Sequence, residues 1–512
     1  MWVVARHNEF LPIRGRSAVL QRVRPDMNRR RHLPICRRWK LHLKTESQPS
    51  PHRLQSRPSP CPTTIMPLCI LHPLSYQANP ADYFARVRHA PGAMLLESGR
   101  PVAARGRFDL LSAWPIQTLT PADGENGRAF FQRLRVSLAE LGQAELPDDQ
   151  PLPFAGGLLG YLAYDFGQRL EPLPSTAMDD LNVADAHLGL YAWAMISDHQ
   201  QQTSQLLFHP GLASEERQRL VALFEAPPPS SVGRYQLTGK FVADLSASDY
   251  RRGIERVQAY IQAGDCYQVN FTQRFKANST GDPWAAYCRL REACPTPFSG
   301  YIALGGDDAV LSFSPERFVK VSQGQVQTRP IKGTRPRRAD PTADAAEAAE
   351  LLASPKDRAE NLMIVDLLRN DLGRSCKVGS VRVPELFSLE SYPNVHHLVS
   401  CITGELADGQ DVLDLLAGSF PGGSITGAPK IRAMQVIDEL EPTRRGLYCG
   451  SLLYLDVRGE MDSSITIRTL LVKGGQTFCW GGGGIVADSD CDAEYQESIG
   501  KVRLLLDTLE SL

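Results

Sequence analysis

The way in which strand-like and helix-like segments alternate constrains the fold of this chain more than any other feature. From residue 66 to about residue 225 the sequence is a series of short apolar runs separated by turn residues, which is typical of antiparallel strands. Further along, amphipathic helices lie between more strand-like runs, but no regular strand–helix–strand repeat is present. The pattern therefore predicts an α+β fold with large antiparallel sheets and not a doubly wound parallel sheet.

Apolar residues at helical spacing predict three helices. The first covers residues 248–263 with Ser248 as its N-cap, the second covers residues 357–372 with Leu362 at the start of its core stripe, and the third runs from about 492 to 509. The expected strands are residues 93–97, 108–112, 156–161, 188–196, 203–208, 267–275, 300–304, 310–313, 318–321, 397–405, 450–457, 464–472 and 476–480.

Composition divides the chain into four parts. Residues 1–65 are basic and Ser/Pro-rich without a helical or strand period, which favours a start codon assigned too early. A disordered basic tail, a targeting segment and a polyanion-binding segment are the alternatives. Residues 66–225 are expected to form an N-terminal region, residues 226–247 a stiff linker that begins with a Pro-rich stretch, and residues 248–512 a catalytic domain.

The charges exclude some classes of partner. Residues 1–65 hold 14 Lys or Arg and 3 acids, whereas the rest of the chain holds 42 basic and 54 acidic residues, and such an acidic body is a poor match for nucleic acid. No apolar run reaches the roughly 18 residues of a membrane span. The 11 Cys residues include no CxxC pair, which is typical of reduced thiols. We therefore expect a cytoplasmic protein that binds neither nucleic acid nor membrane.

Lys332 is the strongest candidate for a reactive side chain. It lies between the apolar run that ends at Ile331 and the turn residue Gly333, and four arginines lie within six residues of it. Nearby cations and burial both disfavour the ammonium form of a lysine, and a neutral lysine is a nucleophile. The alternative is a solvated basic turn in which Gly333 only supplies the bend.

Two pairs of acids have a spacing that suits a metal ion. Asp357 and Glu360, and likewise Glu494 and Glu497, are three residues apart on predicted helices, so each pair faces one side. Two such faces could hold Mg²⁺, which binds one or two protein carboxylates, several waters and anionic substrate oxygens. Lys501, one turn beyond Glu497, could neutralise a substrate carboxylate. The alternative is that all four are ordinary solvent-facing acids.

Two glycine-rich segments and one acid complete the candidates. The loop 422–430 lacks the Walker spacing but enters a predicted helix at Pro429, where backbone N–H groups attract anions. Residues 481–484 are four consecutive glycines, which either let backbone approach a ligand or mark a tight strand end. Glu316 follows a predicted strand and could act as a general acid if burial raised its pKa, but alone it is an ordinary turn acid.

In their order along the chain, these motifs resemble the chorismate-binding catalytic domain that anthranilate, isochorismate, salicylate and aminodeoxychorismate synthases share. The resemblance covers about residues 248–505, and residues 66–225 resemble the N-terminal region of the same family. It implies large antiparallel sheets packed as a β-sandwich with helices outside. The motifs that carry it lie at residues 314–317, 330–334, 357–360, 367–371, 397–400, 423–430, 465–468 and 494–497, with Lys501.

The resemblance also implies a role for each motif residue. Lys332 is implied as the nucleophile that attacks C2 of chorismate, and Glu316 as the acid that protonates the departing C4 hydroxyl, after which ammonia adds at C4 and expels the lysine. The implied cofactor is Mg²⁺, with Glu360, Glu497, Asp357 and Glu494 as its ligands. The implied substrate-binding residues are Gly333, Thr334, His397, Tyr448, Arg468, Gly484 and Lys501. The residues implied for a tryptophan pocket are Glu97, Ser98, Pro297 and Phe298.

Two positions indicate a branch of the family. Lys332 stands where anthranilate synthases usually carry alanine, and a lysine there resembles the aminodeoxychorismate synthases of the para-aminobenzoate branch of folate synthesis. Gln268 stands where water-adding relatives carry a base lysine, which fits ammonia as the nucleophile. Because the chain shows no glutaminase motif, a separate glutamine amidotransferase subunit is implied as the partner. The alternatives are anthranilate synthase component I and a non-catalytic binding protein.

Overall fold

A computed structural model of the chain describes most residues from Met66 onward. Residues 64–512 form one compact unit. The predicted extension over residues 1–65 lies outside the described residues. Within the described part, no helix has both the length and the apolar character needed to cross a membrane. The described residues are 66–99, 106–147, 150–229, 233–392 and 395–512.

The larger of two sheets has 13 strands, and its described pairs are antiparallel. The strand order is β1-β8-β7-β3-β2-β12-β13-β22-β23-β11-β10, with β9 and β19 also paired to β11. Strands from the first half of the chain therefore lie beside strands from the second half. The bounds are β1 Ile70–Leu74, β2 Met94–Glu97, β3 Phe108–Ser112, β7 Trp193–Asp198, β8 Thr203–Phe208, β9 Tyr235–Leu237, β10 Val242–Ala243, β11 Gln268–Gly281, β12 Phe298–Gly305, β13 Asp308–Ser314, β19 Gly427–Ala428, β22 Thr469–Lys473 and β23 Gln476–Ile485.

The smaller sheet has 10 strands in the order β16-β18-β15-β14-β21-β20-β5-β6-β4, with β17 also paired to β18. Its described pairs are antiparallel as well. The predicted α+β class with large antiparallel sheets is confirmed. The bounds are β4 Gln117–Leu119, β5 Gly157–Leu162, β6 Ala186–Tyr191, β14 Arg317–Ser322, β15 Gln325–Arg329, β16 Ile331–Pro336, β17 Arg382–Ser391, β18 Val395–Glu405, β20 Ser451–Asp456 and β21 Met461–Ile465.

The main apolar core lies between the two sheets. Leu110 of the larger sheet and Leu453 of the smaller sheet belong to the same buried cluster. A side chain added at Gly300 of β12 would lie 3.0 Å from Leu452 of β20, so the two sheets approach closely there. A second buried cluster, which includes Leu311 of β13, packs helices against the outer face of the larger sheet. The sheets therefore form a sandwich with helices outside.

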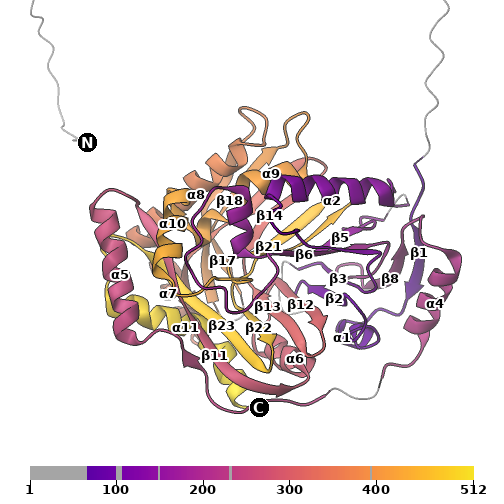
Figure 1. The fold of residues 1–512 in the computed structure, drawn as a ribbon, viewed down its shortest axis with the longest axis horizontal. Helices are drawn as coiled ribbons and strands as arrows, with labels where there is room; N and C mark the ends of the chain where they lie inside the picture. The colour runs from indigo at the N-terminus through magenta and orange to yellow at the C-terminus, as the bar shows by residue number, and fades with distance from the viewer. Residues whose placement is uncertain (1–65, 100–105, 148–149, 230–232, 393–394) are drawn as a thin grey trace, which may run out of the picture. The chain divides into compact units, whose positions relative to one another are not determined.

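Several of the helices gather at one end of the unit. Figure 1 shows α5, α8, α10 and α11 together at the left, with α4 and β1 at the opposite end. The helix bounds are α1 Ala81–Phe84, α2 Gly127–Leu141, α3 Gly167–Leu170, α4 Ser214–Glu225, α5 Ala247–Gln262, α6 Pro283–Ala293, α7 Pro341–Ala353, α8 Pro355–Gly373, α9 Val412–Ser419, α10 Lys430–Leu440 and α11 Cys491–Glu510, and the short 3₁₀ turns are η1 Tyr164–Phe166 and η2 Gly423–Ile425.

Two of the predicted strands were wrong in the same way. The run 188–196 is not one strand, because β6 ends at Tyr191 and β7 begins at Trp193 in the other sheet. The run 464–472 divides between β21 and β22, again in different sheets, and Arg468 between them has a φ of 51°. Both runs are buried almost throughout, so apolar residues continue where the chain crosses from one sheet to the other.

Three local helix predictions were also wrong. Leu362 is 52% exposed, because the buried stripe of α8 begins one residue earlier, at Asn361. The N-cap of α5 is Ser246 and not Ser248, and the Ser246 hydroxyl accepts a backbone N–H of the first turn. Pro429 is the N-cap of α10, with an extended backbone, and not its first helical residue.

Candidate active site

Lys332 lies on β16, the edge strand of the smaller sheet. The pairing of β16 with β18 changes register between Ile331 and Thr334, so Lys332 and Gly333 occupy an irregular part of the strand. Gly333 has a φ of 89°, and a side chain there would lie 2.8 Å from Leu351 and 3.0 Å from Asp357. Glycine is therefore needed for β16 to follow this path and to pack against α7 and α8.

The two reactive candidates meet at Ser424 in η2. The Ser424 hydroxyl donates to Glu316 Oε1 at 2.7 Å, and the Ser424 carbonyl oxygen accepts from Lys332 Nζ at 3.2 Å. Glu360 Oε1 lies 3.9 Å from the same Nζ, and the Lys332 side chain is 13% exposed. The structure thus brings the predicted nucleophile and the predicted acid to two sides of one serine.

Glu316 has the environment that a general acid needs. It is buried, and burial raises the pKa of its carboxyl group, although the Ser424 hydrogen bond and the Lys332 charge act in the opposite direction. A carboxyl group with a raised pKa keeps its proton closer to neutral pH, where it can give it to a leaving group. Burial therefore raises the pKa of Glu316 in the direction that a general acid requires.

The four arginines near Lys332 do not form the uncompensated cationic surroundings that the sequence predicted. Each guanidinium group is compensated by at least one carboxylate, so the expectation that these charges act on Lys332 is corrected. The described contacts of Lys332 Nζ are instead with Ser424 and Glu360. The arginine pairs are Arg329 with Glu385 and Glu390, Arg335 with Glu350 and Asp357, Arg337 with Asp344, and Arg338 with Glu347.

The glycine run 481–484 lies within β23 and not at a tight strand end. The whole run pairs with β11, from Gly481 opposite Gln273 to Gly484 opposite Asn270. A side chain at Gly483 would lie 3.0 Å from a carboxylate oxygen of Glu494 and 3.4 Å from one of Glu497, and a side chain at Gly484 would lie 2.9 Å from Glu360 Oε1. Acids of both predicted pairs therefore converge on these glycines from α8 and α11.

Each of the four acids also has a protein partner. Among the described residues, no group of three or more His, Cys, Asp or Glu side chains could hold a metal ion as placed. Mg²⁺ requires only one or two protein carboxylates, and Glu360 and Glu497 offer hard oxygens beside glycines that leave space. These two residues fit Mg²⁺ in donor type. The partners are Arg335 for Asp357 at 2.9 Å, Gln268 for Glu360 at 2.8 Å, Ser489 for Glu494 at 2.7 Å and Lys501 for Glu497 at 2.7 Å.

Burial and charge separate the two acids of α11. Burial raises the pKa of Glu494, which is 4% exposed, and the neighbouring Glu497 adds to that rise. Burial acts in the same direction on Glu497, but the ammonium groups of Lys501, Lys356 and Lys332 together outweigh it and hold the pKa of Glu497 below its usual range. Glu497 is therefore the acid of this pair that stays anionic most readily.

Thr334, His397 and Arg468 form a second polar group of the site. Thr334 Oγ1 lies 2.9 Å from His397 Nδ1, across the β16–β18 pairing. Burial, with a contribution from Arg468, lowers the pKa of His397 to about 4, so its ring is neutral at pH 7. The Arg468 side chain forms no hydrogen bond or ion pair with any described residue. An uncompensated guanidinium of this kind suits the carboxylate of a ligand.

The remaining predicted substrate residues lie around β23. Tyr448 is buried and stacks on Trp480, the residue before the glycine run, with ring centroids 5.9 Å apart. Lys501 Nζ donates to the carbonyl oxygen of Gly482 at 2.8 Å. Gln268 is buried against Gly484; its Nε2 donates to Glu360, while its Oε1 has no hydrogen-bond partner among the described residues.

A separate cavity of about 1240 Å³ lies between the sheets. Pro315 and Ile331, the neighbours of Glu316 and Lys332, line it as well. Because successive side chains of an extended chain point to opposite sides, this cavity borders the catalytic strands on the side away from the reactive groups. Its lining includes all four residues of the predicted tryptophan pocket, Glu97, Ser98, Pro297 and Phe298.

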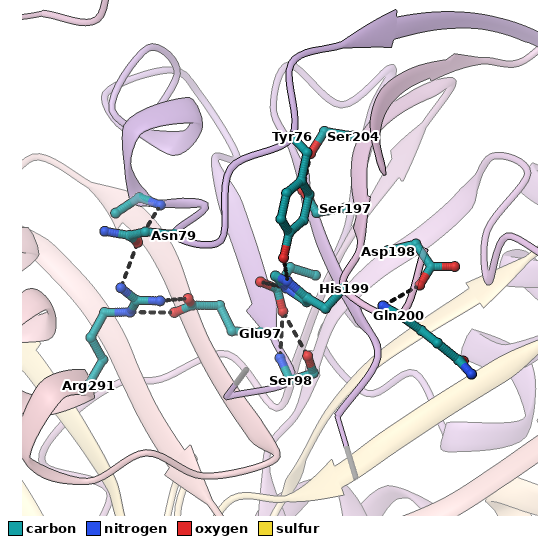
Figure 2. Close-up of polar contacts among 12 residues, drawn as sticks. Tyr76, Asn79, Glu97, Ser98, Ser197, Asp198, His199, Gln200, Ser204 and Arg291 are labelled. Atoms are coloured by element: carbon teal, nitrogen blue, oxygen red, sulfur yellow. Dashed lines mark hydrogen bonds and ion pairs between the residues drawn. The ribbon is translucent and has the colours of Figure 1, made fainter. Parts of the chain in front are cut away.

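Two polar residues of this cavity wall, Glu97 and Ser98, are held by protein partners, as Figure 2 shows. Glu97 forms an ion pair with Arg291 of α6. Ser98 donates its backbone N–H and its hydroxyl to Asp109 Oδ1, at 2.7 and 3.0 Å. Asp109 Oδ2 in turn lies 2.6 Å from His199 Nε2. The carboxylate of Glu97 and the hydroxyl of Ser98 are therefore already engaged.

Ser424 lies within the 423–430 motif, but its role was not predicted from the sequence. Its partners Lys332 and Glu316 are 92 and 108 residues away in the chain. A polar side chain between glycines in a loop next to a helix was the available signal. Nothing in the sequence indicated which groups that side chain contacts.

The sequence matches the chorismate binding enzyme family over residues 92–507. The chain therefore belongs to this family, and the predicted resemblance is confirmed. It is 48% identical over 459 residues to aminodeoxychorismate synthase component 1 of Salmonella typhimurium, which covers 88% of this chain and 99% of the relative. It is also 38% identical over 403 residues to anthranilate synthase component 1 of Cereibacter sphaeroides, covering 76% of this chain and 79% of the relative.

Solved structures confirm the fold. The crystal structure of anthranilate synthase component I from Streptococcus pneumoniae matches with a TM-score of 0.70 at 30% sequence identity, covering 78% of this chain and 92% of that chain. The predicted anthranilate synthase component I-like fold is thus confirmed, and the two large antiparallel sheets are its main feature.

Proposed function

We propose that this protein converts chorismate and ammonia into 4-amino-4-deoxychorismate for para-aminobenzoate and folate synthesis, with ammonia supplied by a glutamine amidotransferase subunit. The observation that carries the proposal is the placement of Lys332 and Glu316 on two sides of Ser424. A nucleophile and an acid that act on one ring divide a difficult displacement into two easier steps. Two relatives named aminodeoxychorismate synthase component 1 are 48% and 47% identical to the chain.

The first step forms a bond between the Lys332 amine and C2 of chorismate. The two conjugated double bonds of the ring shift, the C4–O bond breaks, and Glu316 gives its proton to the leaving hydroxyl, which departs as water. Ammonia then forms a bond to C4, the two double bonds shift back, and the Lys332 amine leaves. The proton released from the new amine restores Glu316. The net reaction consumes chorismate and ammonia and yields the amino product and water.

The other residues bind and orient the substrate. Arg468, whose guanidinium has no partner among the described residues, binds the enolpyruvyl carboxylate together with Tyr448 and the backbone of Gly484. Thr334 and His397 line the ring, and Lys501 lies next to the ring carboxylate. Glu360 and Glu497, with support from Asp357 and Glu494, would hold Mg²⁺, which when bound would compensate the charge of that carboxylate.

Gln268 favours ammonia over water as the nucleophile. Its Nε2 donates to Glu360, and its buried Oε1 accepts no hydrogen bond from any residue that the structure describes. An amide cannot take a proton from water at neutral pH, whereas ammonia that arrives as NH₃ needs no base. The residue therefore supports a reaction in which ammonia attacks without activation.

The described cysteines support a separate source of ammonia. Release of ammonia by a cysteine-dependent glutaminase needs a reactive thiolate, whose pKa is lowered by its surroundings. Burial instead raises the pKa of the described thiols, for example to about 12 for Cys288 and to about 11 for Cys376. A partner subunit that hydrolyses glutamine is therefore part of the proposed function.

We also propose that the cavity between the sheets binds tryptophan. Its volume exceeds that of an indole side chain, and its lining includes Leu96, Phe108 and Phe298 as apolar walls. The ligand would have to share Glu97 with Arg291. Titration calorimetry with tryptophan tests this: saturable binding that Ser98→Trp removes supports it, and absence of binding at millimolar tryptophan overturns it.

The test of the proposed activity is mass spectrometry of the product from chorismate, Mg²⁺ and ammonium. The proposal predicts a product that keeps the enolpyruvyl group and has exchanged a hydroxyl for an amino group. Anthranilate, which has lost pyruvate, would instead identify an anthranilate synthase. Because NH₃ and ammonium interconvert with pH, rates at different pH values are to be compared at constant free NH₃.

A further inference from the structure

Ser424 contacts both reactive groups through two different atoms. Its hydroxyl donates to Glu316 Oε1 at 2.7 Å, and its carbonyl oxygen accepts from Lys332 Nζ at 3.2 Å. Ser424 is 8% exposed and Glu316 is 6% exposed, so water does not readily replace this hydroxyl. Among the described residues, Ser424 supplies the only side-chain hydrogen bond to the Glu316 carboxyl group.

The turn that carries Ser424 is held rigidly. Arg445, which is 2% exposed, donates to the carbonyl oxygen of Ile425 at 3.0 Å. The backbone N–H of Asn270 donates to the carbonyl oxygen of Thr426 at 2.8 Å. The residues that follow pair with β11 through β19. These contacts of the residues that follow Ser424 fix the position from which Ser424 reaches its two partners.

We infer that Ser424 is a positioning residue, whose hydroxyl orients the carboxyl group of Glu316 while its carbonyl oxygen holds the amine of Lys332. This inference rests on the proposed function and deepens it. A donor to Oε1 leaves Oε2 as the oxygen that carries the transferable proton, so the proton points in one direction. Without the hydroxyl, the backbone hydrogen bond at Ile331 is the remaining donor, and no side chain directs the proton to one oxygen.

Few other groups face Glu316. Lys332 of β16 and Lys501 of α11 favour its ionised form, as does a backbone hydrogen bond at Ile331. Cys449, just before β20, is a buried thiol that burial keeps protonated. Loss of the Ser424 hydroxyl removes one donor that favours the carboxylate, so the pKa of Glu316 rises and the acid stays protonated to higher pH.

The first experiment compares Ser424→Ala with Ser424→Thr. We expect Ser424→Ala to lower kcat about 10- to 100-fold with little change in KM, because the acid is misplaced while substrate binding is retained. The alkaline limb of the kcat profile, measured at constant free NH₃, should move to higher pH. Ser424→Thr keeps a hydroxyl, so it should retain most of the rate, and the alkaline limb of its kcat profile should lie at the same pH as in the unaltered protein.

The matched control is Ser419→Ala. Ser419 is also buried, at 3% exposed, but its hydroxyl has no hydrogen-bond partner among the described residues. It should keep the rate and the pH profile. If Ser424→Ala lowers the melting temperature, Ser424→Cys takes its place, because a thiol fills the same space and is a weak donor.

A double-mutant cycle decides between positioning and a general structural effect. In a Glu316→Gln background, adding Ser424→Ala should lower kcat further by less than about twofold, because the effect of Ser424 acts through Glu316. An unchanged rate and profile for Ser424→Ala, or an additive loss in the Glu316→Gln background, would overturn the inference. If Lys332→Ala and Glu316→Gln themselves kept full activity, the proposed function would be wrong, which is a separate outcome.

Discussion

Lys332 and Glu316 show how residue-scale chemistry depends on partners that are remote in sequence. Both were candidates from their local motifs, but the structure adds what makes them act together, which is the contact of each with Ser424. The prediction that nearby arginines act on Lys332 was wrong, because those arginines form ion pairs with acids. A run of charged residues shows which charges are present, but it does not show which oppositely charged side chains pair with them in the fold.

The first prediction concerns Lys332. Replacement by alanine should lower the rate of 4-amino-4-deoxychorismate formation by orders of magnitude at saturating ammonium, because the nucleophile is lost, while the fold is retained. Product formation and the melting temperature are the measurements. Lys473→Ala, which removes a lysine whose nearest described acid is Asp308 at 3.9 Å, is the control. Near-normal turnover by Lys332→Ala would rule out covalent catalysis by this residue.

The second prediction concerns Asp165, a buried acid of η1 that accepts the backbone N–H of Gly446 at 2.8 Å. Burial raises its pKa to about 7 from an ordinary value of 3.8. The folded state therefore favours the protonated acid: its contribution to stability is fully present below about pH 4 and is lost as the pH rises through 7.

Asp165→Asn keeps an acceptor for Gly446 but cannot ionise. It should raise the free energy of unfolding at pH 8 by up to a few kcal/mol, at about 1.4 kcal/mol for each unit of pKa shift, and the gain should shrink toward pH 4. Denaturant unfolding at both pH values measures this. A destabilised variant at pH 8, or a gain that does not depend on pH, would contradict the assigned ionisation.

At the scale of elements, β23, α8 and α11 bring together the acids that are the candidate Mg²⁺ ligands. Gly483 and Gly484 leave the space in which acids from α8 and α11 approach β23. The third prediction is that Gly484→Ala lowers activity and raises the Mg²⁺ concentration for half-maximal rate, because its side chain would lie 1.8 Å from Gln268 Nε2 and 2.9 Å from Glu360 Oε1. Mg²⁺ titration of the rate is the measurement.

Gly500→Ala is the matched control for Gly484→Ala. Gly500 lies on α11, where an added side chain would meet nothing within 4 Å. Alanine there should leave the Mg²⁺ requirement unchanged and stabilise the helix slightly. If Gly484→Ala behaved like this control, the close packing of β23 against Gln268 and Glu360 would not matter for the site.

The fourth prediction concerns the metal. A chelator should abolish activity and Mg²⁺ should restore it, and Glu360→Gln or Glu497→Gln should each raise the Mg²⁺ requirement by at least about tenfold. Asp366→Asn, an exposed acid on the same helix α8, is the control and should behave like the unaltered protein. Turnover in the presence of excess chelator would contradict a role for these acids in holding Mg²⁺.

Element boundaries also show what the sequence could and could not predict. The strand 108–112 and the main helices were predicted within a few residues, because their apolar periods are strong. The crossings between sheets at Ala192 and at Arg468 were missed, because both sides of each crossing are buried and apolar. The motifs of the family predicted the candidate site residues, whereas the contacts of Ser424 and the ion pairs of the arginines join residues far apart in the chain and could not be predicted from it.

At the scale of the whole molecule, every candidate site residue lies within the compact unit of residues 64–512. The fifth prediction is that a chain starting at Met66 has the same melting temperature and the same kcat/KM as the full chain. In the full chain, residues 1–65 have no apolar period from which a buried surface could form. Loss of folding or of activity in the shortened chain would show that residues 1–65 are required.

Intact-protein mass spectrometry of the chain with chorismate and Mg²⁺, in the absence of ammonia, tests the central claim most directly. Without ammonia the second step cannot occur, so a covalent species should accumulate whose added mass is that of chorismate less one water. Peptide mapping should place it on Lys332, Lys332→Ala should lack it, and added ammonium should discharge it as 4-amino-4-deoxychorismate. An adduct on another residue, or full product formation with ammonium by a protein that never carries the adduct, would contradict the account.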